Sequence, residues 1–118
     1  MSRAGLSAVL LATAVLGFGA ASANAFECVF ITECYEAEGC SGTTFNIEVD
    51  IHAEAVSTDF GDLQIVAVKE TDVVTTLFAT GDGAEYLLSL TPRAARFTAH
   101  NNSGPEVISY LGQCEGAY

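Results

Sequence analysis

Cysteine is the residue type in this chain whose spacing has the clearest chemical meaning. Three cysteines lie close together in the stretch ECVFITECYEAEGC and one lies near the C-terminal end: Cys28, Cys34, Cys40 and Cys114. Zinc sites usually combine two short C-x2-4-C units, whereas this chain has C-x5-C-x5-C followed by a long gap. The spacing therefore favours two disulfide bonds over a zinc site in an exported protein.

Four cysteines allow three pairings, and all three tie Cys114 to the N-terminal cysteine-rich segment. The remaining disulfide then closes a short local loop. We expect Cys40–Cys114 and Cys28–Cys34, because Cys40 immediately precedes the first clear strand and Cys114 follows the last. In the chain-entropy model a long-range disulfide of this kind stabilises a small domain by roughly 4–5 kcal/mol.

The first residues of the chain indicate export. Arg3 is the only charge before Glu27, an apolar and small-residue run covers residues 6–19, and Ala23-Asn24-Ala25 fits a cleavage site. We therefore predict a signal peptide over residues 1–25 and a single secreted domain over residues 26–118, periplasmic or extracellular. A transmembrane helix is the alternative. It is disfavoured because no basic cluster follows the run, and we expect no stable membrane anchor.

The predicted mature domain is strongly acidic. Lys69, Arg93 and Arg96 stand against 15 aspartates and glutamates, a formal net charge of −12. Such a surface repels nucleic acid and anionic membranes, and it suits a basic protein or a cation as partner. An acidic surface also keeps a protein soluble, and this role alone would explain the charge without any partner.

Residues that could bind a metal or catalyse a reaction form no specific motif. Glu48, Asp50 and His52 share one face of a predicted strand and resemble a minimal ligand set, but a solvated sheet face explains them as well. We predict no metal and no cofactor.

Nucleophilic catalysis has an equally weak signature. Ser57, Asp59 and His100 can be combined into a triad, as can many such triples in any chain. The chain has no G-x-S-x-G motif. We predict that it is not an enzyme.

Apolar patterning predicts strands as the elements that hold these residues. Phe45, Ile47 and Val49 alternate with polar residues, which indicates a strand with one buried face. Asp82-Gly83 between two apolar runs indicates a tight hairpin turn. The predicted strands are residues 43–52, 63–70, 73–80, 84–91, 94–100 and 106–114. Residues 28–42 add either another strand or a turn of helix.

The predicted fold is therefore all-β, an antiparallel meander of about six to seven strands. Short turns between strands force antiparallel neighbours. Closing the sheet into a small barrel or folding it into a sandwich would cover its open face and edges. The disulfides would staple either form.

The sequence also resembles the periplasmic lysozyme-inhibitor barrels of bacteria, and more generally small exported bacterial β-proteins. The resemblance lies in the leader, the small acidic β domain, the late Cys114 and the stretch Asp82-Gly83-Ala84-Glu85-Tyr86. The family has serine where this chain has Asp82, and its K-G-x-x-A motif is absent. The resemblance implies a barrel whose end is tied to its start, and inhibition of a basic, lysozyme-like enzyme.

The predicted function is a non-enzymatic binding module of the cell envelope. Arg96 and His100 share the polar face of one predicted strand, and with Tyr86 they are the candidate partner contacts. The partner is a basic protein or a small ligand. The alternatives are an inhibitor of a basic enzyme, and a carrier that holds a small apolar ligand in a barrel pocket lined by aromatic residues.

Overall fold

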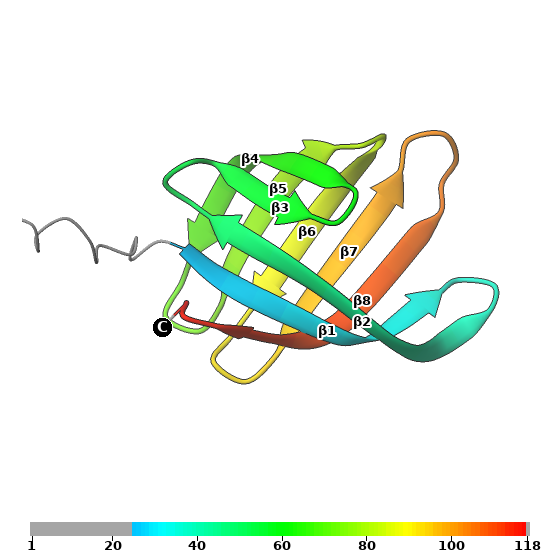
Figure 1. Ribbon diagram of the computed structural model, residues 1–118, viewed down its shortest axis with the longest axis horizontal. Helices are drawn as coiled ribbons and strands as arrows, with labels where there is room; N and C mark the ends of the chain where they lie inside the picture. The colour runs from blue at the N-terminus through cyan, green and yellow to red at the C-terminus, as the bar shows by residue number, and fades with distance from the viewer. Residues whose placement is uncertain (1–24, 118) are drawn as a thin grey trace, which may run out of the picture.

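The structure is a computed structural model that describes residues 25–117, which form an eight-stranded antiparallel barrel (Figure 1). In chain order the strands are β1 (Ala25–Tyr35), β2 (Gly39–Asp50), β3 (Ala55–Thr58), β4 (Gly61–Glu70), β5 (Thr75–Gly81), β6 (Ala84–Leu90), β7 (Ala95–Asn101) and β8 (Val107–Glu115). Each strand pairs with the next, and β8 pairs with β1 to close the barrel. The predicted all-β antiparallel meander is confirmed, as a barrel and not as a sandwich.

Two strands go beyond the six that the sequence predicts. Residues 28–42, for which the sequence permits either a strand or a turn of helix, form most of the β1–β2 hairpin. The four-residue strand β3 lies between the first two predicted strands, and it pairs with β4 through the turn at Asp59 and Phe60. The first predicted strand is too long at its end: β2 stops at Asp50, and His52 lies in the following turn.

The barrel interior is filled by apolar side chains from alternate positions of every strand, as is typical for eight strands. Phe45, Ile47 and Val49 of β2 face inward as predicted, and so do alternate residues of β6 and β7. The most deeply buried side chains are Phe30, Phe97, Ile47, Leu63, Leu77, Leu88, Leu90, Val49, Val56 and Cys28. No polar or charged residue among residues 25–117 belongs to this core.

The disulfides are Cys28–Cys114 and Cys34–Cys40. The predicted pairs Cys40–Cys114 and Cys28–Cys34 are therefore wrong, although the structure does tie the last strand to the first. The strand register gives the physical reason. Cys28 lies directly opposite Cys114 in the β1–β8 pair, and Cys34 lies directly opposite Cys40 in the β1–β2 hairpin.

The two ends of the barrel differ. The turns at residues 36–38, 59–60, 82–83 and 102–106 lie at one end, which we call the cavity end and which is on the right in Figure 1. The start of β1 and the end of β8 lie at the other end. The predicted signal peptide falls outside the described residues except for Ala25, which begins β1. None of the described residues belongs to a helix capable of spanning a bilayer.

Candidate functional site

Six aromatic rings form one connected cluster toward the cavity end of the barrel. They come from β1, β2, the β3–β4 turn, β6, β7 and β8: Phe30, Phe45, Phe60, Tyr86, Phe97 and Tyr110. Tyr86 stacks on Phe97 with ring centroids 5.4 Å apart, and Phe60 lies 6.4 Å from Tyr86 in a similar orientation. The cluster stiffens the interior, because aromatic contacts of this kind add to the stabilisation from burial alone.

A cavity of about 220 Å³ opens beside this cluster at the cavity end. Its walls are the aromatic rings of the cluster and small residues of β6 and β7, and its rim is the β5–β6 turn. The lining residues are Phe60, Asp82, Gly83, Ala84, Tyr86, Phe97, Ala99, Asn101, Ile108 and Tyr110. None of them carries a positive charge.

The hydroxyl groups of the two tyrosines in this cavity differ in their hydrogen bonding. Tyr110 is hydrogen-bonded to Glu33, and burial followed by this carboxylate raises the pKa of its phenol. Tyr86 is only 6% exposed, and its hydroxyl has no hydrogen-bond partner among residues 25–117. Burial, followed by the negative charges of Asp82 and Glu85, raises the pKa of Tyr86. The cavity thus combines aromatic walls, an unpaired hydroxyl and a negative rim.

The rim is held in place by a well-defined turn. Asp82 and Gly83 have φ angles of 49° and 76°, so both central residues are left-handed, as in a type I′ hairpin turn. The predicted Asp82-Gly83 turn is confirmed. Asn102 donates its backbone N–H to the Gly83 carbonyl at 2.9 Å and its side-chain amide to Glu85 at 3.0 Å. The β7–β8 loop therefore fixes the β5–β6 turn.

The β1–β2 hairpin carries an open strand edge. Residues Gly39 to Asp50 pair with β1, but only Glu48, Val49 and Asp50 also pair with β3. Among the described residues 25–117, no strand pairs with the outer side of residues 39–47, and this segment, the open edge of β2, extends past its neighbours at the lower right of Figure 1. Unpaired N–H and C=O groups in such an edge form a template for another strand.

Carboxylates surround the tip of this hairpin. Glu36 accepts a hydrogen bond from the Val107 backbone N–H at 2.6 Å, which ties the tip to the start of β8. Burial raises the pKa of Tyr35, and the nearby carboxylates of Glu33, Glu38 and Glu106 raise it further. The exposed Cys34–Cys40 disulfide links the two strands just below the tip. The hairpin is thus a stiff, acidic projection.

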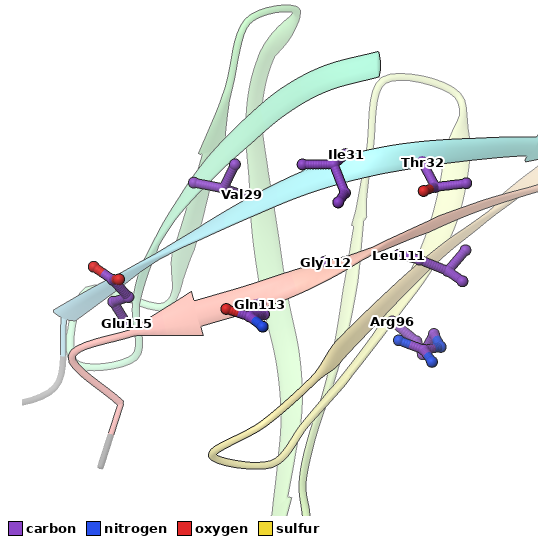
Figure 2. A pocket seen from close by; sticks show the side chains of 8 residues that line it. All are labelled: Val29, Ile31, Thr32, Arg96, Leu111, Gly112, Gln113 and Glu115. Atoms are coloured by element: carbon purple, nitrogen blue, oxygen red, sulfur yellow. The ribbon is translucent and has the colours of Figure 1, made fainter. Parts of the chain in front are cut away.

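An apolar groove of about 490 Å³ runs along the outer surface of β1, β7 and β8. Val29 and Ile31 are 44% and 65% exposed and form its floor together with Leu111. Figure 2 shows Arg96 and Glu115 at opposite ends of the groove. A groove of this kind can accept an apolar side chain from another protein.

The three predicted contact residues do not form one site. Arg96 borders the outer groove, where its guanidinium donates to the Ala95 carbonyl at 3.1 Å. His100 lies on the same outer face of β7, opposite Glu85. Tyr86 faces the barrel interior and lines the cavity. Its unpaired hydroxyl has no sequence signal, because only the packed barrel reveals it.

The metal and triad candidates are also placed apart. Asp50 Oδ1 accepts the Ala53 N–H at 3.0 Å and so stabilises the turn that contains His52. Among the described residues no three His, Cys, Asp or Glu side chains are arranged to hold a metal. Ser57 and Asp59 belong to β3 and its turn, whereas His100 lies on β7, four strands away around the barrel.

Taken together, the structure defines a small, acidic, disulfide-bonded β-barrel with an aromatic cavity at one end and an open strand edge beside it. No family model matches the chain, and no curated protein or solved structure shows significant similarity to it.

Proposed function

We propose that this domain is an exported, non-enzymatic binding module that captures an extended segment of a basic protein along the open edge of β2. The observation that carries the proposal is that residues 39–47 pair with β1 and with no other strand of the described part of the chain. An added strand would complete the hydrogen bonds of this edge, which is a recurrent mode of peptide recognition.

The edge lacks charged side chains and proline, two of the features that usually prevent such pairing. It has one irregularity, where Thr43 and Thr44 of β2 lie against the single residue Ile31 of β1. Natural edge strands are blunted by charged side chains, prolines or bulges that twist them away. Residues 39–47 read GCSGTTFNI and contain neither a charge nor a proline. The Cys34–Cys40 disulfide holds the hairpin in its paired form. Because the hairpin is already ordered, peptide binding costs it little conformational entropy, and this favours affinity.

The carboxylates that flank the open edge of β2 support a basic partner. Glu36 and Glu38 precede the edge and Glu48 follows it, so the uncharged segment has carboxylates at both ends. A partner strand with small or apolar residues in its middle and lysine or arginine at its ends is complementary to this pattern. A second copy of the domain is disfavoured: antiparallel pairing of two edges about Thr43 would place Glu38 opposite Glu48.

The test uses a synthetic seven-residue peptide of alternating threonine and valine with lysine at both ends, and a matched peptide with glutamate at both ends. We expect the lysine peptide to bind, to lose affinity as salt rises, and to slow amide hydrogen exchange within residues 40–46. Thr44→Lys, which places a charge on the exposed edge, should abolish binding. Gln64→Lys is the matched control, because exposed Gln64 is paired on both sides.

Two results would overturn the proposal. One is binding that Thr44→Lys leaves unchanged, and the other is binding without protection of the β2 amides. A basic lysozyme-like enzyme is one partner of the required chemistry, so its inhibition is measured with the same variants. Inhibition by the wild type that is lost in Thr44→Lys and kept in Gln64→Lys would assign the inhibitor role to this edge.

A further inference from the structure

The cavity at the cavity end has the size of a small-molecule site. Its volume is about 220 Å³, and an apolar cavity of about 150 Å³ in another protein is large enough to hold benzene. The cavity is therefore too small for a drug-sized molecule but can enclose one compact organic molecule. None of residues 39–47 lines the cavity, so occupation of one site does not require the other.

The walls of the cavity favour a positive charge. Aromatic ring faces carry negative charge density and attract cations. Phe60, Tyr86, Phe97 and Tyr110 all line the cavity. Tyr86 and Phe97 stack on each other, with ring centroids 5.4 Å apart and 12° between their planes.

The polar groups of the cavity favour the same charge. The Tyr86 side chain is only 6% exposed, and its hydroxyl has no hydrogen-bond partner among residues 25–117, so a ligand that reaches it gains a hydrogen bond. Asp82 lies at the rim and acts on Tyr86 through its negative charge. The carboxylate of Glu33 is hydrogen-bonded to the neighbouring Tyr110. Glu33 itself does not line the cavity, so the oxygen atoms that a ligand meets are those of Asp82, Asn101 and the two tyrosines, and no lining residue repels a cation.

We propose that this cavity binds a small organic ammonium ion, with its apolar body against the rings of Tyr86 and Phe97 and its nitrogen toward the Asp82 carboxylate and the Tyr86 hydroxyl. This inference is independent of the proposed capture of a basic protein. It differs from a carrier of neutral apolar ligands because it requires a charge on the ligand.

The test compares benzylammonium with benzyl alcohol, two probes of nearly equal size that differ in charge. Titration calorimetry and NMR chemical shifts are measured with the whole domain. We expect benzylammonium to bind about tenfold or more tightly than benzyl alcohol, because only the charged probe gains from the rings and the carboxylate. The shifts should concentrate on the lining residues.

Three variants separate this site from general attraction to an acidic protein. Asp82→Asn keeps a residue that tolerates the left-handed conformation and should reduce benzylammonium affinity to that of the alcohol. Asp72→Asn removes one charge from an exposed turn at the opposite end and should change little. Tyr86→Phe removes only the unpaired hydroxyl and should weaken benzylammonium binding several-fold.

Equal affinity for the two probes in the wild type would overturn the proposal in favour of a neutral apolar cavity. An equal loss of benzylammonium affinity in Asp82→Asn and Asp72→Asn would also overturn it, as would the absence of binding of either probe to the wild type. Thr44→Lys should leave benzylammonium binding intact, so failure of the edge proposal and failure of the cavity proposal can be told apart.

Discussion

Gly112 of β8 lies directly opposite Phe30 of β1, and the two backbones approach so closely there that no side chain fits between them. A Cβ atom on Gly112 would overlap the Val29 carbonyl oxygen and lie 2.6 Å from the Phe30 Cα. The register of β1 against β8 shifts at this point, because Ile31 is an extra residue in β1. Glycine thus permits the contact between the first and last strands.

Gly112→Ala should destabilise the barrel by about 3 kcal/mol or more, since backbone atoms on both sides must move to make room. Urea unfolding measures the effect. Gly104→Ala is the matched control, because a Cβ at Gly104 meets nothing within 4 Å and its φ is not in the left-handed region. Its unfolding free energy should change by no more than about 0.5 kcal/mol. Equal stability of the two variants would contradict this account of Gly112.

The two disulfides should differ in what they contribute to stability. Cys28 and Cys114 are separated by 86 positions, and Cys34 and Cys40 by 6. In the chain-entropy model the long loop corresponds to roughly 4–5 kcal/mol and the short one to roughly 2 kcal/mol. We expect the Cys28→Ala/Cys114→Ala variant to unfold at much lower urea than the Cys34→Ala/Cys40→Ala variant. The reverse order would show that the hairpin disulfide dominates.

Alkaline pH should weaken the fold through Tyr110. Burial and the Glu33 carboxylate raise the pKa of Tyr110 above the ordinary tyrosine value of about 10. The stabilisation linked to this raised pKa is fully present below about pH 10 and is lost as the pH rises through the folded-state pKa. Unfolding free energies should therefore fall above about pH 10.

Tyr110→Phe gives the matched comparison for this pH effect. Near neutral pH the variant should lose about 1 kcal/mol with the hydrogen bond to Glu33. Above about pH 10 its stability should fall less steeply than that of the wild type, and phenolate absorbance should show one late-titrating group fewer. If the unfolding free energies of the two proteins fall in parallel above about pH 10, the loss of stability belongs to other residues.

Acid titration should report the hydrogen bond between the β6 strand and the β7–β8 loop. The Asn102 side chain, and then Thr80, hold the pKa of Glu85 below its usual value. This stabilisation is present above the ordinary glutamate pKa and is lost as the pH falls through the lowered one. Asn102→Ala should raise the pKa of Glu85 toward its usual value in a carboxyl NMR titration. An unchanged value would assign the shift to Thr80 alone.

Local sequence patterns predicted those strands and turns whose conformation is determined by residues close together in the chain. The alternation of Phe45, Ile47 and Val49 marked a strand whose inward face is now buried. Asp82-Gly83 marked a turn in which both residues have positive φ. These features depend on neighbours in the chain, so the sequence displays their cause directly.

Features that depend on the register between strands could not be predicted from the sequence. The disulfide prediction failed because it used the order of elements along the chain, whereas Cys34 is bonded to the residue directly across the hairpin. The shortness of β3 and the resulting open edge of β2 follow from pairing that no local pattern specifies. The unpaired hydroxyl of Tyr86 is visible only after every neighbouring side chain has been placed.

The pairing of Cys28 with Cys114 also sets an order of events during folding. Cys34 and Cys40 are close in the chain and share one hairpin, so they can pair in an oxidising compartment before β8 has joined the barrel. Cys28 must wait as a reactive thiol until the final strand has emerged. A bond between Cys28 and Cys34 formed in that interval would leave Cys114 without its partner. A hairpin disulfide that forms first would remove Cys34 from this competition before Cys114 arrives.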